Sequence, residues 1–400
     1  MNRLFNTIRP YAWGSTTAIP ELLGTEPTGE PQAELWMGAH PGAPSRIDRG
    51  DGLVALDTVI AADPAAALGE ATVKRFGPTL PFLLKVLAAG APLSLQVHPD
   101  LAQARAGFAD EEARGIPLDA PFRTYKDANH KPEMLVALSP FDGLCGFRRP
   151  TEAAELLDTL GVGSLAPYVD ILRAHPEDRA LREVLAAVLS ADPDDMRPTV
   201  HDATEAAIRL AASPGTPYAA SYAAYAKAAH SFPGDRGIIA AMLLNHVRLQ
   251  PGEALYLGAG VPHAYLDGLG VEIMANSDNV LRCGLTPKHI DVPELLRVVR
   301  FEAGDPAVLR PEAAADGEEL YAAPIDEFRL SRYVLAPGAQ ARRLDPSSPQ
   351  ILLCTDGEAR LRTDDATALT LAAGESAFIP AGEHAEISGA GTVFRAAVAA

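Results

Sequence analysis

Residues 94–100, SLQVHPD, alternate between polar and apolar side chains. Successive side chains of a β-strand point to opposite faces, so Ser94, Gln96 and His98 would share one face. Polar groups that lie side by side on a buried strand face need partners. A metal ion is one partner that could serve an amide oxygen and an imidazole together. A candidate metal site therefore begins on this strand.

Two further segments carry side chains that could complete the site. NHKPEM (129–134) contains Glu133, and VPHAYLDG (261–268) contains His263. Taken alone, Glu133 could be a surface carboxylate and His263 a turn residue. In an extended segment Lys131 would share the face of Glu133, whereas His130, at an odd offset, would point away. We therefore leave His130 out of the candidate site.

A third stretch, VEIMANSDNVLRCGL (271–285), places Glu272 in an apolar segment and Arg282 ten residues later. Strand, Asn/Asp turn and strand is typical of a β-hairpin. The pattern predicts that Glu272 and Arg282 lie on neighbouring strands near the metal. Such a pair could be a catalytic base with a cation, or a structural salt bridge.

Composition bounds the class of protein. A length of 400 residues suggests two or three domains. The formal net charge of −18 argues against nucleic acid and anionic membranes as partners. Three scattered cysteines without a C-x-x-C motif favour a reducing compartment. Neither a signal peptide nor an apolar run of about 20 residues is evident, so we expect a cytoplasmic protein.

Periodicity divides the chain into β-like and helical parts. Short β-like runs fill residues 1–148, and apolar spacings of three and four residues predict helices over 149–236, with Thr151 and Asp202 as caps. From residue 247 the chain reads as β again. PGEALYLGAGVPHAYLDG (251–268) and AGESAFIPAGEHAEISG (373–389) form a weak internal repeat that resembles the cupin jelly roll.

We thus expect a mainly β fold with two cupin-like jelly-roll domains and an α-helical domain. Residues 1–148 and 237–305 would form the catalytic jelly roll, interrupted by the helical insertion 149–236. Residues 306–400 would form the second jelly roll. His384, in the second repeat, has no Gln-x-His segment upstream, so that domain is expected to be metal-free. Trp13 and Trp36 could serve as platforms on which a sugar stacks, but we favour core packing between the β domains.

Seven ordered blocks resemble type I mannose-6-phosphate isomerases. The blocks are YAWGS (11–15), AELWMGAHPGAPS (33–45), PFLLKVL (81–87), LSLQVHPD (93–100), YKDANHKPEM (125–134), VPHAYLDG (261–268) and VEIMANSDNVLRCGLTPKHID (271–291). The resemblance implies one Zn²⁺ per chain. The ligands that it implies are Gln96, His98, Glu133 and His263.

The resemblance also implies an activity and a substrate. Mannose 6-phosphate and fructose 6-phosphate would interconvert through a cis-enediol, in support of mannose metabolism and GDP-mannose synthesis. Arg282 matches the catalytic arginine of the family, and the substrate phosphate would meet Lys85, Ser94 and Lys288. Proton transfer between C1 and C2 needs a base, for which Glu272 is our first candidate and Lys131 the second.

Two other functions remain open at this point. A cupin dioxygenase would use two histidines, a carboxylate and open metal positions for oxygen. A catalytically inactive protein that only binds sugar phosphates would keep the same residues. In each case the expected partner is a small molecule rather than a nucleic acid or membrane. We expect a monomer or a weak oligomer.

Overall fold

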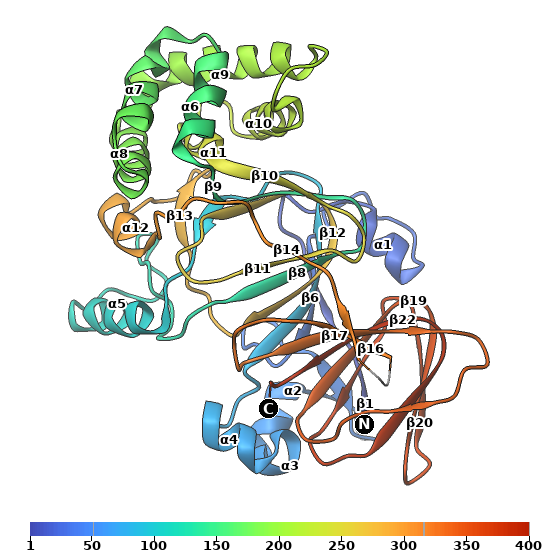
Figure 1. The fold of residues 1–400 in the computed structure, drawn as a ribbon. Coiled ribbons are helices and arrows are strands. Elements are labelled where there is room, and N and C mark those ends of the chain that lie inside the picture. Colours follow the sequence, from blue (N-terminus) through green and yellow to red (C-terminus); the bar gives the residue numbers. More distant parts are fainter. Residues whose placement is uncertain (51, 315–316, 400) are drawn as a thin grey trace.

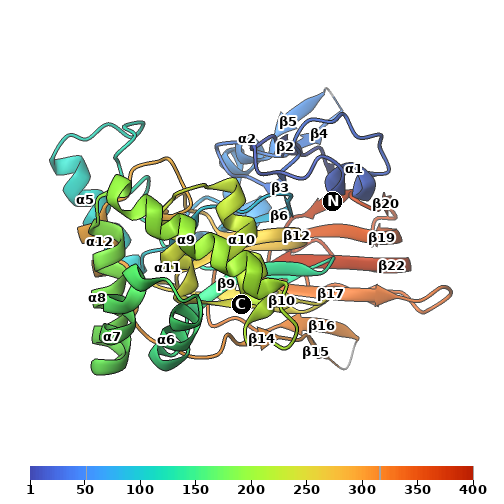
Figure 2. The same cartoon turned by 90° about the horizontal axis from the view of Figure 1, so that it is seen from above.

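The computed structural model describes residues 1–50, 52–314 and 317–399 of the chain. Figures 1 and 2 place a group of helices at one end and the C-terminal strands at the other, with a larger sheet between them. The expected fold class, mainly β with cupin-like jelly rolls and a helical part, is confirmed.

The larger sheet is antiparallel, with its strands in the order β14-β11-β8-β12-β6-β3-β2, and β7, β9, β10 and β13 join it off this path. Its strands are β2 (Thr7–Arg9), β3 (Glu34–Gly38), β6 (Phe82–Ala89), β7 (Leu95–Val97), β8 (Glu133–Ala137), β9 (Phe141–Phe147), β10 (Leu244–Leu249), β11 (Ala254–Leu257), β12 (His263–Ala275), β13 (Leu281–Gly284) and β14 (Val308–Leu309). Strand β6 is buried along its whole length, which explains its almost unbroken apolar sequence.

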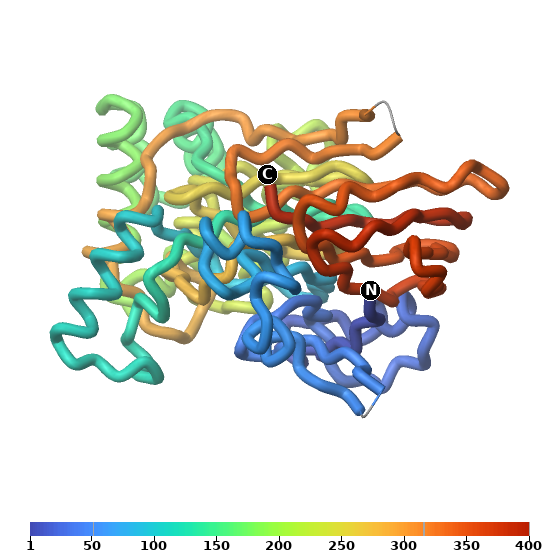
Figure 3. Tube along the Cα trace, turned by 90° about the horizontal axis from the view of Figure 1, so that it is seen from below, coloured from blue at the N-terminus to red at the C-terminus, as the bar shows by residue number. Residues whose placement is uncertain are grey.

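The C-terminal sheet has the order β1-β21-β19-β22-β17-β16-β15, with β18 and β20 off this path. Its strands are β1 (Asn2–Leu4), β15 (Glu312–Ala313), β16 (Glu318–Tyr321), β17 (Arg329–Leu335), β18 (Arg342–Arg343), β19 (Gln350–Thr363), β20 (Ala368–Ala372), β21 (Ser376–Ile379) and β22 (Ala385–Ala397). The N-terminal β1 pairs with β21, so the start of the chain joins the C-terminal sheet, and Figure 3 shows the N-terminus against the C-terminal strands. A separate pair is β4 (Arg46–Asp48) with β5 (Leu53–Ala55).

The two large sheets share apolar packing. One buried cluster contains Leu84 and Val86 of β6, Ile273 of β12, and Ile351 and Phe394 of the C-terminal sheet. Burial of such side chains stabilises each by roughly 1.5–3 kcal/mol relative to exposure. The C-terminal strands therefore support the sheet that carries the candidate site. The domain boundaries expected from the sequence stay a prediction.

The helices predicted between residues 149 and 236 are present. They are α6 (Pro150–Thr159), η1 (Gly163–Leu165), α7 (Ala166–Ala174), α8 (Glu177–Ser190), α9 (Pro193–Ala211) and α10 (Ala219–Ser231). The predicted caps are wrong, because Thr151 lies inside α6 and Asp202 in the middle of α9. The cap of α9 is Asp192, whose carboxylate accepts from the backbone N–H of Asp194 at 2.8 Å.

The remaining helices lie outside this group in the sequence. They are α1 (Ala18–Leu23), α2 (Leu56–Ala62), α3 (Pro64–Leu68), α4 (Glu70–Phe76), α5 (Leu101–Ala113), α11 (Gly237–Met242) and α12 (Val292–Val298). Among the described residues, none of the helices has the length and apolar character needed to cross a membrane.

The predicted hairpin between Glu272 and Arg282 is wrong. Glu272 of β12 lies opposite Lys85 of β6 on one side and Leu135 of β8 on the other. Arg282 of β13 lies opposite Gln96 of β7. The end of β12 that carries Glu272 already has a neighbour on both sides, so it offers no free edge to β13. The chain therefore crosses to β7 after the NSDN segment.

Candidate active site

Three buried side chains meet where strands of the larger sheet begin or end. His98 follows β7, Glu133 begins β8 and His263 begins β12. One possible ligand atom from each lies within 4.8 Å of the other two. His98 Nε2 is 3.5 Å from Glu133 Oε1, and His263 Nε2 is 3.4 Å from Glu133 Oε2. These are three of the four metal ligands expected from the sequence.

Backbone carbonyls orient both imidazoles of this His–Glu–His group. The Nδ1–H of His98 donates to the carbonyl of Asn279 at 2.8 Å, and the Nδ1–H of His263 donates to that of Val261 at 2.9 Å. Because a carbonyl can only accept, each ring carries its proton on Nδ1 and presents the lone pair of Nε2. His98 Nε2 and Glu133 Oε2 are buried without a hydrogen-bond partner. Two lone pairs and a carboxylate aimed at one point suit a cation.

The electrostatics keep these groups in the forms that bind metals. Burial lowers the pKa of His98 to about 4, so the ring is neutral near pH 7. Burial alone would raise the pKa of Glu133, but Lys131 and His98 outweigh it and hold that pKa well below its usual range. Lys131 Nζ lies 3.2 Å from Glu133 Oε1, so the two residues share a face as predicted.

Gln96 and His130 lie where the strand pattern indicated. Gln96 is opposite His263 in the sheet, and its amide nitrogen is 3.3 Å from His263 Nε2, so its amide borders the group. His130 points elsewhere, and its Nε2 is 2.5 Å from Glu327 Oε1. The odd offset from Glu133 therefore separated the two side chains as expected.

A buried ion pair lies behind the group. Lys85 Nζ is 3.0 Å from Glu272 Oε2 and 3.7 Å from Glu34 Oε1. Burial raises the pKa of Glu272 against the opposing effect of Lys85, and the carboxylates of Glu133 and Glu34 raise it further. The ion-pair partner of Glu272 is thus Lys85, not Arg282. A carboxylate with a raised pKa next to a metal-binding group is suited to proton transfer.

The sequence patterns indicated neither Glu34 nor Tyr265 at this place, and Trp36 was expected elsewhere. Glu34 approaches Lys85, and the indole N–H of Trp36 donates to Glu34 Oε2 at 2.6 Å. Trp36 also lies with its ring 5.5 Å from Lys85 Nζ, so it borders this site. Its buried cluster includes Leu83 and Met274 of the larger sheet and no residue of the C-terminal sheet, so it does not pack between the β domains. Burial, together with Glu272 and Glu133, raises the pKa of Tyr265 well above its usual value.

The alternation of strand side chains could have found Tyr265, but not Glu34, because β3 holds no candidate ligand. Tyr265 is two residues after His263 on β12, and Glu34 and Trp36 are two apart on β3. Period-two neighbours share a face. Applying that rule outward from every candidate ligand would have identified Tyr265 before the structure.

The remaining cations gather at a different place from Lys85. Arg282 lines a small cavity of about 20 Å³ with residues of 121–124 and 289–291. Lys288 is exposed, and the charge of Arg282, together with partial burial and Lys126, lowers its pKa. Arg282 is thus one of the charges that act on Lys288. Ser94 directly precedes β7 and is partly exposed.

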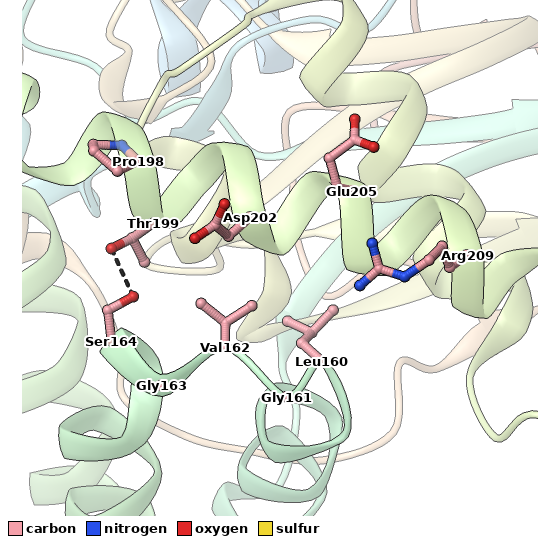
Figure 4. Close-up of a pocket in the computed structure, with 10 residues that line it drawn as sticks. All are labelled: Leu160, Gly161, Val162, Gly163, Ser164, Pro198, Thr199, Asp202, Glu205 and Arg209. Carbon is pink, nitrogen blue, oxygen red and sulfur yellow. Dashed lines mark hydrogen bonds between the residues drawn. The ribbon is translucent and has the colours of Figure 1, made fainter.

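A larger cavity occurs in the helical part, but it has no group of side chains that could hold a metal among the described residues. A cavity of about 520 Å³ lies between α9 and the segment 160–164 (Figure 4). Asp202, Glu205 and Arg209 line its α9 side, and Thr199 donates to Ser164 at 2.8 Å. None of the groups in the described chain that could hold a metal includes these residues. The His–Glu–His group is therefore the candidate active site.

The fold and this group define a cupin-type protein with a metal-binding site. The family model for the catalytic domain of type I phosphomannose isomerase matches residues 1–150. The mannose-6-phosphate isomerase of Escherichia coli is 43% identical over 386 residues, which cover 96% of this chain and 95% of the relative. That of Salmonella typhimurium is 42% identical over 399 residues, or 99% of both chains. The chain belongs to the type I mannose-6-phosphate isomerase family.

Solved structures agree with this assignment. A crystal structure of zinc-bound mannose 6-phosphate isomerase matches with a TM-score of 0.90 at 41% identity, covering 100% of this chain and 99% of the other. A mutant of phosphomannose isomerase from Salmonella typhimurium matches with a TM-score of 0.91 at 41% identity and full coverage of both chains. The assignment favours an isomerase over the dioxygenase considered from sequence.

Proposed function

We propose that this protein interconverts D-mannose 6-phosphate and D-fructose 6-phosphate with one bound Zn²⁺. The observation that carries the proposal is the buried His–Glu–His group, with unpartnered His98 Nε2 and Glu133 Oε2, beside the Glu272–Lys85 pair. The near full-length relatives named mannose-6-phosphate isomerase supply the substrate class.

His98, Glu133 and His263 would hold the zinc ion, and Gln96 would be the fourth ligand. The Gln96 amide nitrogen lies 3.3 Å from His263 Nε2, so a half-turn of this amide would present its carbonyl oxygen instead. Since Glu133 is the one anionic ligand in this set, the bound ion would keep net positive charge. Zinc bound there would act as a Lewis acid on oxygen atoms of the sugar.

Glu272 is the proposed base that moves the proton between C1 and C2. Its pKa is raised by burial and by two neighbouring carboxylates, which brings it closer to neutral pH. Lys85 would balance its charge when it is ionised, because the two side chains are 3.0 Å apart. Lys131, which is paired with Glu133, is the second candidate for this role.

The phosphate group would bind near Arg282 and Lys288, with Ser94 as a further contact. A bound phosphate would offset the charge of Arg282, which lowers the pKa of Lys288. Lys85 departs from the expectation here, because its ion-pair partners are Glu272 and Glu34. We therefore propose a charge-balancing role for Lys85 in place of phosphate binding. Arg282 would also stabilise the developing oxyanion.

The decisive experiment measures metal content and isomerase activity on one purified sample. Removal of zinc by a chelator should abolish the conversion of fructose 6-phosphate, and added zinc should restore it. Full activity in verified metal-free protein would refute the metal site. Zinc-loaded protein that binds the sugar phosphate without turnover would instead indicate an inactive binding protein, and oxygen uptake would indicate a dioxygenase.

A further inference from the structure

We propose that Asn279 is a positioning residue of the metal centre, which ties His98 to the segment that leads into Glu133. The inference rests on the proposed metal site but not on the reaction. Asn279 is fully buried and lies in the connection between β12 and β13. The NSDN segment does not close a hairpin, because β13 pairs with β7 and not with β12 in the described residues, so its polar side chains have another role.

The backbone of Asn279 acts on His98. Its carbonyl oxygen accepts the Nδ1–H of His98 at 2.8 Å. This bond fixes the tautomer and the rotation of the imidazole, so that Nε2 faces Glu133. A shift of the Asn279 carbonyl would therefore turn the ring or release its Nδ1–H.

The side chain of Asn279 acts on the segment before Glu133. Its Oδ1 accepts from the backbone N–H groups of Lys126 at 2.7 Å and Asp127 at 3.2 Å. Its Nδ2 donates to the carbonyls of Asp127 and Asn129, each at 2.8 Å. One amide thus satisfies four backbone groups of residues 126–129, four residues ahead of a metal ligand.

Neighbouring groups hold Asn279 in this position. Ser277 Oγ accepts the backbone N–H of Asn279 at 3.1 Å and donates to Asp127 Oδ1 at 2.9 Å. Asp127 Oδ2 accepts the backbone N–H of Asp278 at 2.7 Å. The connection 276–279 and the segment 126–129 are therefore one hydrogen-bonded unit. Because this unit holds His98 by a carbonyl and leads into Glu133, it sets the separation of the two ligands.

The test is the substitution Asn279→Asp, which keeps the size of the side chain but replaces the donating NH₂ with an acceptor. The new oxygen would face the carbonyls of Asp127 and Asn129, which cannot donate to it. We expect the Kd for zinc, measured by competition with a chromophoric chelator and without substrate, to rise about 10–100-fold. With cobalt in place of zinc, the visible absorption bands should shift, because the ligand geometry changes.

Asn245→Asp is the matched control. Asn245 is also buried, and its Nδ2 donates to the carbonyls of Phe147 at 3.0 Å and Gly304 at 2.8 Å and makes longer contacts to those of Gly146 at 3.3 Å and Cys145 at 3.4 Å. None of these groups holds His98 or the segment before Glu133. The Asn245→Asp variant should lower the Tm, while its zinc Kd and its cobalt spectrum stay at wild-type values. If Asn279→Asp behaves in the same way, Asn279 is merely structural and the inference is overturned.

A milder variant covers the case in which Asn279→Asp does not fold. Ser277→Ala removes the hydroxyl that supports Asn279 but leaves the amide in place. A several-fold rise in the zinc Kd of folded Ser277→Ala would support the inference, and a wild-type Kd would overturn it. Wild-type protein that binds zinc but does not isomerise the sugar would refute the proposed reaction and leave this inference standing. Wild-type protein that does not bind zinc would refute both.

Discussion

Two buried polar clusters differ in how completely their hydrogen bonds are satisfied. In the C-terminal sheet, Arg395 donates to Glu318 at 2.9 Å, to the Gln350 side chain at 2.7 Å and to the carbonyl of Asp345 at 3.1 Å. All three of its guanidinium nitrogens are thus engaged within the protein. In the larger sheet, His98 Nε2 and Glu133 Oε2 have no such partner.

The difference separates a structural cluster from a binding site. A buried charge whose hydrogen bonds are all made inside the protein stabilises one packing arrangement and offers nothing to a ligand. Buried lone pairs without partners are costly, so their convergence in the His–Glu–His group indicates an ion. Arg329 Nε, next to Glu318, also lacks a hydrogen-bond partner, so a single unpartnered atom does not make a site. The convergence of unpartnered atoms of His98 and Glu133 on one point identifies it.

The strongest test of this comparison removes a metal ligand. His98→Ala and His263→Ala should each lose bound zinc and lower kcat/KM by about 10³-fold or more, because Lewis-acid stabilisation contributes several kcal/mol. Metal analysis and the isomerase assay on the same sample measure both effects. A variant that keeps full activity without metal would contradict the assignment.

The next test concerns the base. Glu272→Gln should keep zinc and fold but lower kcat by roughly 10²–10⁴. In the wild type, kcat/KM should rise with pH through the pKa of Glu272, which lies above the usual carboxyl range, because the base works when ionised. That inflection should vanish in the variant. Exchange of solvent deuterium into the sugar tests the same step.

Loss of zinc in Glu272→Gln in proportion to lost activity would give the residue a structural role. The search for the base would then move to Lys131, which pairs with Glu133.

Breaking the satisfied cluster should affect stability alone. Arg395→Leu removes one of the two arginines that pair with the buried carboxylate of Glu318. The other, Arg329, remains 3.1 Å away. Loss of one partner from a buried ion pair costs about 3–5 kcal/mol in the free energy of unfolding. Urea unfolding measures that cost, whereas zinc Kd and kcat should not change in the folded protein. A large loss of bound zinc would mean that the two clusters are coupled.

A smaller effect is expected at the phosphate end. Lys288→Ala would remove the proposed charge-assisted contact with the phosphate, of roughly 1.5–3 kcal/mol, and should lower kcat/KM for mannose 6-phosphate by about one to two orders of magnitude. Turnover of unphosphorylated mannose should change less. Lys227→Ala, at a partly exposed lysine paired with Asp267, is the control. Equal kinetics for the two variants would make Lys288 an ordinary surface residue.

The smallest effect should come from His130→Ala. His130 is paired with Glu327 and not with the His–Glu–His group. The variant should keep its zinc and most of its activity, and lose about 1–2 kcal/mol of stability with the hydrogen bond. Metal analysis beside His263→Ala decides the matter. If His130→Ala empties the site and His263→Ala does not, the wrong histidine has been chosen.

Local periodicity was enough to predict several parts of the molecule. Alternation along β7 placed Gln96 and His98 on one face, and the odd offset of His130 from Glu133 excluded it from the ligands, because strand geometry has a period of two. Spacings of three and four residues likewise determined the helices between 150 and 231. The family resemblance supplied His263, which no local pattern connects to His98.

Tertiary structure decided which distant strands are neighbours. The partner of Glu272 is Lys85, 187 residues away, because β12 lies between β6 and β8 and leaves no edge for β13. The same arrangement carries Asn279 to His98 and brings Trp36 to Lys85. Strand order depends on which apolar faces bury best together across the whole chain. A spacing of ten residues between Glu272 and Arg282 therefore could not show that their strands pair with different neighbouring strands.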